Sequence, residues 1–218
     1  MESREALYVG LSLAFRPPTQ GHVEGGLNNG LSGIVAEAGQ ALGCDALRAP
    51  LSRLADYLDA LAQRDLAQAL VELEGEYNRL FVGPLPPLVH PYESVYRTAR
   101  GLVMGDCALD VLRAYAAAGF VLSAEHKDLP DHVAVEFEYM ALLCQREGEA
   151  CAEGLEPVAG ALRVHESTFL ETHLRCWLPT FCQRVLLSAS SPYYGQWAQM
   201  AELFTQWDVQ RMQRARGG

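Results

Sequence analysis

Two short runs near the middle of the sequence hold residue types that could do chemistry. They are HPYESVY (residues 90–96) and DLPDHVAVE (residues 128–136). Carboxylates in such runs can pair with arginine side chains through two hydrogen bonds at once. In the second run His132 and Glu136 stand one helical turn apart, so they could titrate together and bind a cation or a guanidinium group. They could equally form an ordinary surface salt bridge.

The first run has the composition of a peptide-binding surface. Tyr92 and Tyr96 flank Glu93 and Ser94 directly after Pro91, in backbone that we expect to be accessible. Tyrosines beside an acid suit peptide recognition, because the rings offer contact area and the hydroxyls offer hydrogen bonds. The alternative is a capped turn whose tyrosines lie partly exposed at the surface.

Two further segments are rich in aromatic and apolar residues. YNRLFVGP (residues 77–84) should end a helix at Gly83, and FLETHLRCWLPTF (residues 169–181) carries an apolar stripe. Core packing is a sufficient explanation for both. Asp128 and Asp131 also have an ordinary explanation, since acids at the start of a helix stabilise its free N–H groups and its dipole.

The sequence lacks the motifs of most enzymatic and metal sites. The sequence contains no Glu-x-x-His, His-Glu-x-x-His, Gly-x-Ser-x-Gly or Walker A pattern. Its six cysteines include no Cys-x-x-Cys pair, which favours a reduced chain without a zinc site. His165 and His173 stand eight residues apart without a convergent ligand pattern, so we expect them to be core or surface histidines. We therefore predict no catalytic residue, no metal and no cofactor.

Composition narrows the class of partner. The chain has 218 residues, 50% of them hydrophobic, with 17 basic and 27 acidic side chains and a net charge of −10. This balance argues against nucleic-acid binding and allows a cationic peptide. Nine of the acids fall between residues 125 and 156, against Lys127 and Arg146 alone, so a cationic partner should approach the helix that follows Asp131. Without a secretory leader or a long apolar run, we expect a cytoplasmic protein with no stable membrane insertion.

Helices must position these residues, because the apolar spacing is helical throughout and no segment alternates as a strand. We predict an all-α fold, a single bundle-like domain of about eight to ten helices over residues 1–218. The segment 83–91 carries four prolines and should be a stiff crossover, with possible halves at 1–82 and 92–218. A capping box should start a helix at Asp65, and a glycine-rich loop is expected at 21–33. The expected helices cover about 7–15, 51–61, 65–80, 106–116, 128–148, 158–177, 179–188 and 192–214.

In their order along the chain, YNRLFVGP, PYESVY, PDHVAVEFEYM and FLETHLRCWLP resemble the TorD/DmsD family of redox-enzyme maturation chaperones. The resemblance runs from about Glu76 to Pro179. It implies a cytoplasmic, non-enzymatic chaperone that binds the apo form of a molybdenum-cofactor oxidoreductase, its twin-arginine signal peptide, or both. Such a chaperone assists cofactor insertion and delays export until the enzyme is mature. Members of the family occur as monomers or as domain-swapped homodimers.

The resemblance also implies a set of peptide-binding residues. By motif these are Tyr77, Leu80, Phe81, Tyr92, Glu93, Ser94, Asp131, His132 and Glu136. The hypothesis is that the three carboxylates pair with the signal's arginines, while the aromatic and apolar members line a groove for its apolar run. One departure is that the family often reads Glu-Pro-x-Asp-His, whereas here Pro130 directly precedes Asp131. This departure leaves the hinge geometry, and any nucleotide contact linked to it, in question.

Two other classes of function remain open at this point. The first is a helical nucleotide-binding or nucleotide-hydrolysing protein, since weak GTP binding is associated with the family. The second is a ligand-sensing regulator, although residues 1–50 offer only Arg4, Arg16 and Arg48 as basic groups for binding DNA.

Overall fold

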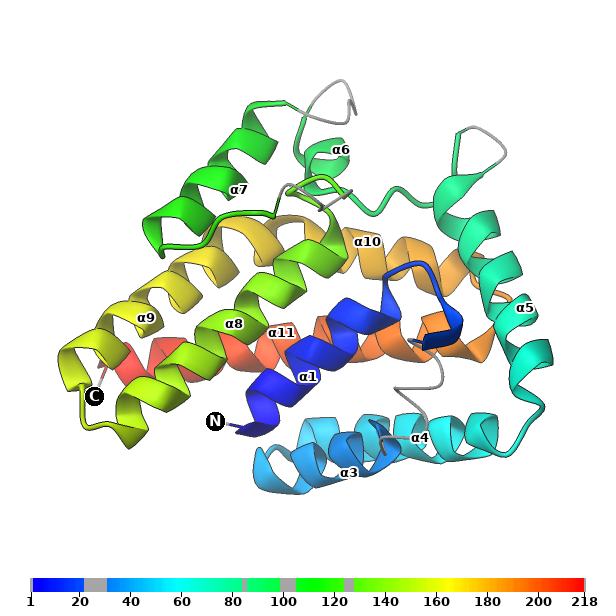
Figure 1. Ribbon diagram of the computed structural model, residues 1–218, viewed down its shortest axis with the longest axis horizontal. Coiled ribbons are helices and arrows are strands. Elements are labelled where there is room, and N and C mark those ends of the chain that lie inside the picture. Colours follow the sequence, from blue (N-terminus) through cyan, green and yellow to red (C-terminus); the bar gives the residue numbers. More distant parts are fainter. Residues whose placement is uncertain (1, 22–30, 84–85, 99–104, 124–127, 218) are drawn as a thin grey trace.

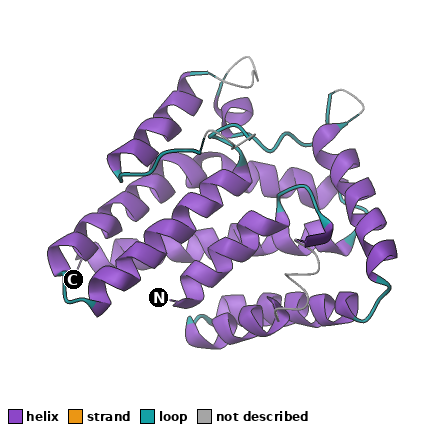
Figure 2. Cartoon of the chain, viewed as in Figure 1, coloured by secondary structure: helices purple, strands orange, loops and turns teal. Residues whose placement is uncertain are grey.

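The chain is folded into helices throughout the computed structural model, which describes residues 2–21, 31–83, 86–98, 105–123 and 128–217 (Figures 1 and 2). The predicted all-α class is confirmed, and within these ranges the strand-like feature is one isolated antiparallel bridge between Tyr92 and His132. Most of the predicted loop at 21–33, together with Pro84 and Lys127, lies outside the described residues. The helices are α1 (Glu2–Ala14), α3 (Leu31–Ala41), α4 (Asp45–Ala62), α5 (Leu66–Tyr77), α6 (Glu93–Arg97), α7 (Asp106–Ala117), α8 (Val133–Ala152), α9 (Glu156–Phe169), α10 (Arg175–Ser188) and α11 (Pro192–Gly217), with π-helical turns η1 (Asn78–Val82) and η2 (Leu170–Leu174).

The long helices form the body of the molecule. Helix α8 packs between α1 and α9, while α10 packs along α11 (Figure 1). The pair α3 and α4 covers α1 and α11 at the lower side of Figure 1, and α6 and α7 lie at the upper side. The segment around α6 therefore contacts the bundle near the N-terminal end of α8 and the start of α10.

Three sequence features that start or end helices act as predicted. The side chain of Asp65 accepts a hydrogen bond from the Gln68 N–H at the start of α5. Gly83 and Gly119 follow η1 and α7 with φ values of 106° and 77°, a backbone conformation that favours glycine. The predicted stops at these two glycines are confirmed.

Several predicted boundaries are wrong, among them the start of α4, which begins at Asp45 rather than at 51, and the end of α9, which lies at Phe169 rather than at 177. Helix α8 begins at Val133 rather than at 128, because the His132 side chain caps it by accepting the Ala134 N–H and the preceding residues form a turn. Pro179 lies inside α10 instead of starting a helix. The π-turn η2 directly before α10 already interrupts the regular hydrogen-bond ladder, so the missing N–H of Pro179 does not end the helix. The division into 1–82 and 92–218 stays a prediction.

A buried ionic network fixes the N-terminal helix. Arg4 is 3% exposed, and its guanidinium donates to both carboxylate oxygens of Asp208 at 2.9 Å and to Glu166 and Glu147. The Tyr8 hydroxyl donates to Asp208 at 2.7 Å. Burial, opposed by the charge of Arg4, raises the pKa of Glu166 to about 7. For Asp208 burial is outweighed by the charge and hydrogen bonds of Arg4, and its pKa is lowered. The network joins α1 to α8, α9 and α11.

Candidate functional site

The two chemistry-bearing runs meet in space. The Glu93 N–H donates to the Asp131 carbonyl at 2.9 Å, and the Val133 N–H donates to the Pro91 carbonyl at 2.9 Å. These two bonds form the isolated bridge between the runs. The Asp131 side chain accepts a hydrogen bond from the Ser94 N–H at 3.0 Å, so this aspartate caps the start of α6. The sequence had suggested that it would cap the start of α8 instead.

Glu93 is an ionised acid at the centre of the cluster. Its carboxylate lies 2.9 Å from Nδ1 of His173 and accepts a hydrogen bond from Arg97 at 2.6 Å. Complete burial favours the neutral acid, but the hydrogen bonds and charges of His173 and Arg97 outweigh it and lower the pKa of Glu93. Arg97 also donates to the Thr172 carbonyl at 2.8 Å, which ties α6 to η2.

The pKa of Glu136 shifts in the opposite direction from that of Glu93. Burial, followed by the charge of Glu93, raises the pKa of Glu136 well above 4.5, even though the indole N–H of Trp177 donates to it at 3.1 Å. The raised pKa favours the protonated form of Glu136 beside the ionised Glu93. The two carboxyls are pushed apart in pKa and titrate as an interacting buried pair.

The predicted peptide-binding residues divide into two groups. Tyr92, Glu93, Ser94, Asp131, His132 and Glu136 belong to this cluster at the junction of α6 and α8. The others lie in the aromatic core: the Phe81 ring centroid is 5.2 Å from that of Tyr77 and 6.1 Å from that of Phe181. Leu80 is fully buried in the same core. Trp177, whose ring is 5.4 Å from Phe181, connects the two groups.

The expected accessibility of the first run is wrong. Glu93 and Ser94 have no exposed surface, Asp131 and Glu136 have none, and His132 is 2% exposed. The cause is the bridge, which places the run over the N-terminal end of α8, and the Tyr115 hydroxyl of α7, which donates to the Pro130 carbonyl at 2.8 Å. In this structure the three carboxylates face the interior, and Tyr92 keeps partial exposure.

Sequence reasoning missed His173 and Trp177 as members of the cluster. Both had been assigned to ordinary packing. His173 pairs with Glu93, which lies 80 positions earlier in the chain, and the local spacing of residues gives no sign of such a partner. For the Arg4 network a signal was present. Arg4 continues the apolar positions Leu7 and Leu11 of α1, and Asp208 follows Phe204 by one turn in α11. A charged residue on an apolar stripe predicts a buried partner of opposite charge.

Replacing Glu136 with glutamine should leave the free energy of unfolding at pH 7 unchanged or raise it. Because the folded pKa is raised, the folded state keeps a proton that the unfolded state releases above about pH 4.5, so stability falls as pH rises. Glutamine keeps an acceptor for Trp177 and removes that pH dependence. Urea unfolding between pH 5 and 8 measures the effect.

The matched control is Glu93→Gln. Loss of the ionised acceptor for His173 and Arg97 should cost about 2–3 kcal/mol. If Glu136→Gln proves as destabilising as Glu93→Gln at pH 7, the assignment of the proton to Glu136 is wrong.

Two other kinds of site are absent from the described residues. Across the part of the chain that the structure describes, no three His, Cys, Asp or Glu side chains are grouped so as to hold a metal ion. Nor does any helix in those ranges have the length and apolar character needed to cross a membrane.

Comparisons with known proteins relate this architecture to one family. The family model described as nitrate reductase delta subunit matches residues 42–183, which contain both runs of the cluster. A chlorate reductase assembly chaperone from Ideonella dechloratans is 34% identical over 67% of this chain and 78% of its own length. The chaperone TorD of Vibrio cholerae is 28% identical over 82% of this chain and 75% of its own, and a selenate reductase assembly chaperone from Thauera selenatis is 34% identical over 57% and 62%.

A solved structure shares the fold. The crystal structure of a candidate redox enzyme maturation protein from Archaeoglobus fulgidus superposes with a TM-score of 0.54 over 93% of both chains, at 20% identity. The match of the family model over most of the chain, together with these relatives, shows that the chain belongs to the TorD-type family of redox-enzyme maturation chaperones.

Proposed function

We propose that this chain is a cytoplasmic assembly chaperone for a molybdenum-cofactor oxidoreductase and has no enzymatic activity of its own. Its client would be the apo form of the catalytic subunit, the twin-arginine signal peptide of that subunit, or both. The observation that carries the proposal is the family match over residues 42–183. Relatives of the chain are named as assembly chaperones for chlorate and selenate reductases. Neither a nucleotide hydrolase nor a ligand-sensing regulator is favoured by these names.

The nine predicted peptide-binding residues remain a proposal, and their exposure suggests the order in which they would contact a peptide. Tyr92 retains exposed surface, and Val82 and Leu88, which precede it in the chain, are each 54% exposed. These side chains offer the first contact. The carboxylates of Glu93 and Glu136 become available to a guanidinium only if the segment that carries α6 separates from α8.

Deleting the gene should lower the activity of the client reductase at least tenfold and leave its catalytic subunit without cofactor. The tagged chain should co-purify with that apo subunit and not with the mature enzyme, because the chaperone is released once maturation is complete. Reductase assays, cofactor content and affinity purification from the native host measure these effects.

In the isolated complex, amide exchange at residues 91–98 should be faster than in the free chain if α6 moves away from α8.

Re-expression of the wild-type gene in the deletion strain is the control. Full reductase activity in the deletion strain, with no subunit co-purified, would refute the chaperone role. A complex with unchanged exchange at 91–98 would retain the chaperone role and refute the opening of the cluster.

A further inference from the structure

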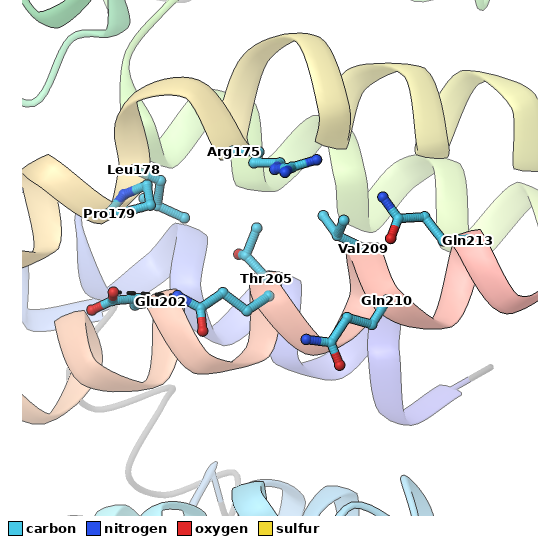
Figure 3. A pocket seen from close by; sticks show the side chains of 9 residues that line it. Arg175, Leu178, Pro179, Glu202, Thr205, Val209, Gln210 and Gln213 are labelled. Atoms are coloured by element: carbon cyan, nitrogen blue, oxygen red, sulfur yellow. Dashed lines mark hydrogen bonds between the residues drawn. The ribbon is translucent and has the colours of Figure 1, made fainter.

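A surface groove of about 300 Å³ runs between α10 and α11, and none of the nine predicted residues lines it (Figure 3). Helix α10 forms one wall and a single face of α11 forms the other. The lining residues are Arg175, Leu178, Pro179, Glu202, Thr205, Gln206, Val209, Gln210 and Gln213.

The floor of the groove is apolar with one unsatisfied hydroxyl. Leu178 and Val209 are 1% and 7% exposed and form its apolar part. Thr205 of α11 is 4% exposed and points toward α10, and its Oγ1 has no hydrogen-bond partner within the described chain (Figure 3). A buried hydroxyl without a partner costs free energy, and a ligand with a polar atom at this depth would remove that cost.

The rim on α11 is a row of carboxamides. Gln206, Gln210 and Gln213 are exposed and stand four and three residues apart, so they project from one face of the helix. A carboxamide donates and accepts hydrogen bonds, as a peptide group does. Such a row can therefore pair with peptide groups of an extended chain while contributing no charge.

The two ends of the groove differ in charge. Glu202 lies beside Pro179 at one end, and Arg175 faces Val209 and the Gln213 end (Figure 3). Among the described residues Glu202 accepts a hydrogen bond from Gln206 at 3.3 Å, and Arg175 has no carboxylate within salt-bridge distance. A segment with a basic end and a neutral body complements this arrangement when its basic end lies at Glu202.

The groove is long enough for a short extended segment. Glu202 and Gln213 are separated by about 16 Å along α11 at a rise of ~1.5 Å per residue, which is the length of about five extended residues.

We infer that this groove binds about five residues of the client polypeptide in an extended conformation, with the apolar stretch along Leu178 and Val209 and the basic flank at Glu202. The inference rests on the proposed function and assigns it a contact surface. Backbone hydrogen bonds to the glutamines supply affinity, the apolar floor selects apolar side chains, and Glu202 sets the direction of the bound segment.

The test uses labelled twin-arginine signal peptides synthesised from the molybdenum-cofactor reductases encoded in the source genome, with binding followed by fluorescence anisotropy. Gln206→Ala/Gln210→Ala should weaken binding at least tenfold. The exposed glutamines Gln40 and Gln63 lie outside the groove, so Gln40→Ala/Gln63→Ala is the matched control and should bind as the wild type does. Glu202→Gln should weaken binding of the natural peptide and leave binding of its Arg→Gln counterpart unchanged.

The failures of the two proposals are distinguishable. If no signal peptide binds the wild-type chain, the signal-peptide part of the proposed function fails and the groove assignment fails with it. If the wild type binds and the glutamine variants bind equally well, the groove assignment alone is wrong. A concentration-dependent dimer that the glutamine variants abolish, in the absence of any effect on peptide affinity, would assign the groove to a second copy of the chain and also refute the inference.

Discussion

Replacement of Arg4 with leucine is expected to lower the free energy of unfolding by about 3–5 kcal/mol, the range found when one partner of a buried ion pair is removed. The guanidinium is the common donor to Asp208, Glu166 and Glu147, whose side chains are at most 5% exposed. Leucine fills part of the volume but leaves three carboxyls facing one another without their cation. Urea unfolding at pH 7 measures the loss.

The pH dependence identifies the cause of that loss. In the wild type the pKa of Glu166 is already about 7, so its folded form binds a proton that the unfolded chain releases above 4.5, and its contribution to stability falls as pH rises from 4.5 to 7. Without Arg4, the contribution of the remaining acids to stability should likewise fall as the pH rises. The difference between variant and wild type should therefore shrink as the pH is lowered toward 5.

Arg48→Leu is the control, because Arg48 pairs with Asp45 and the two side chains are 64% and 89% exposed. It should change stability by no more than about 0.5 kcal/mol. Equal effects of Arg4→Leu and Arg48→Leu would contradict the role assigned to the network.

Glu76→Gln is expected to cost about 2–3 kcal/mol through the loss of charged hydrogen bonds. The Glu76 carboxylate accepts two hydrogen bonds from Arg79, at 2.8 and 2.9 Å, and the N–H groups of Ser190 and Ser191 at 2.6 and 3.1 Å. It therefore joins the end of α5 to the residues that precede α11. These bonds, led by that of Arg79 and opposed by burial, lower the pKa of Glu76 to about 2.

For a lowered pKa the sign of the pH dependence is reversed. The stabilisation by Glu76 is complete above about pH 4.5 and is lost as pH falls toward 2, so the variant and the wild type should converge in acid. Thermal unfolding between pH 3 and 7 tests this. Glu72→Gln, whose exposed carboxylate pairs with exposed Arg64, is the matched control and should show a much smaller change. A constant difference between Glu76→Gln and wild type at all pH values would contradict the pKa assignment.

Local features of the sequence predict the fold class and many helix ends. Helical apolar spacing in α1, the aspartate at 65 and the glycines at 83 and 119 act through interactions within a few residues, so the sequence alone contains the required information. The start of α8 was misplaced because Asp131 has two candidate roles, and the choice of the Ser94 N–H as its partner depends on a segment 37 positions away.

The candidate site could be predicted as a set of residues but not as a surface. The motifs placed the segments 91–96 and 130–136 in one predicted set, and the bridge shows that they touch, while their role in binding stays a prediction. Burial of Glu93 and Glu136 could not be read from composition, since glutamate is rarely fully buried and both stand beside residues typical of surfaces. The groove between α10 and α11 was missed for a related reason, because α10 and α11 meet only in the folded chain and neither wall has a recognisable motif.

The pairing of Arg4 with Asp208 spans 204 positions, which has a consequence for how the chain is made. At 5–20 residues per second, a ribosome needs roughly 10–40 s to proceed from the first residue to the second. During that interval α1 carries an unpaired guanidinium on its apolar face, and α11, which supplies one wall of the groove, does not exist. If the groove binds a client segment as inferred above, a nascent chain can neither secure its first helix nor offer this groove to a client until translation has passed α11.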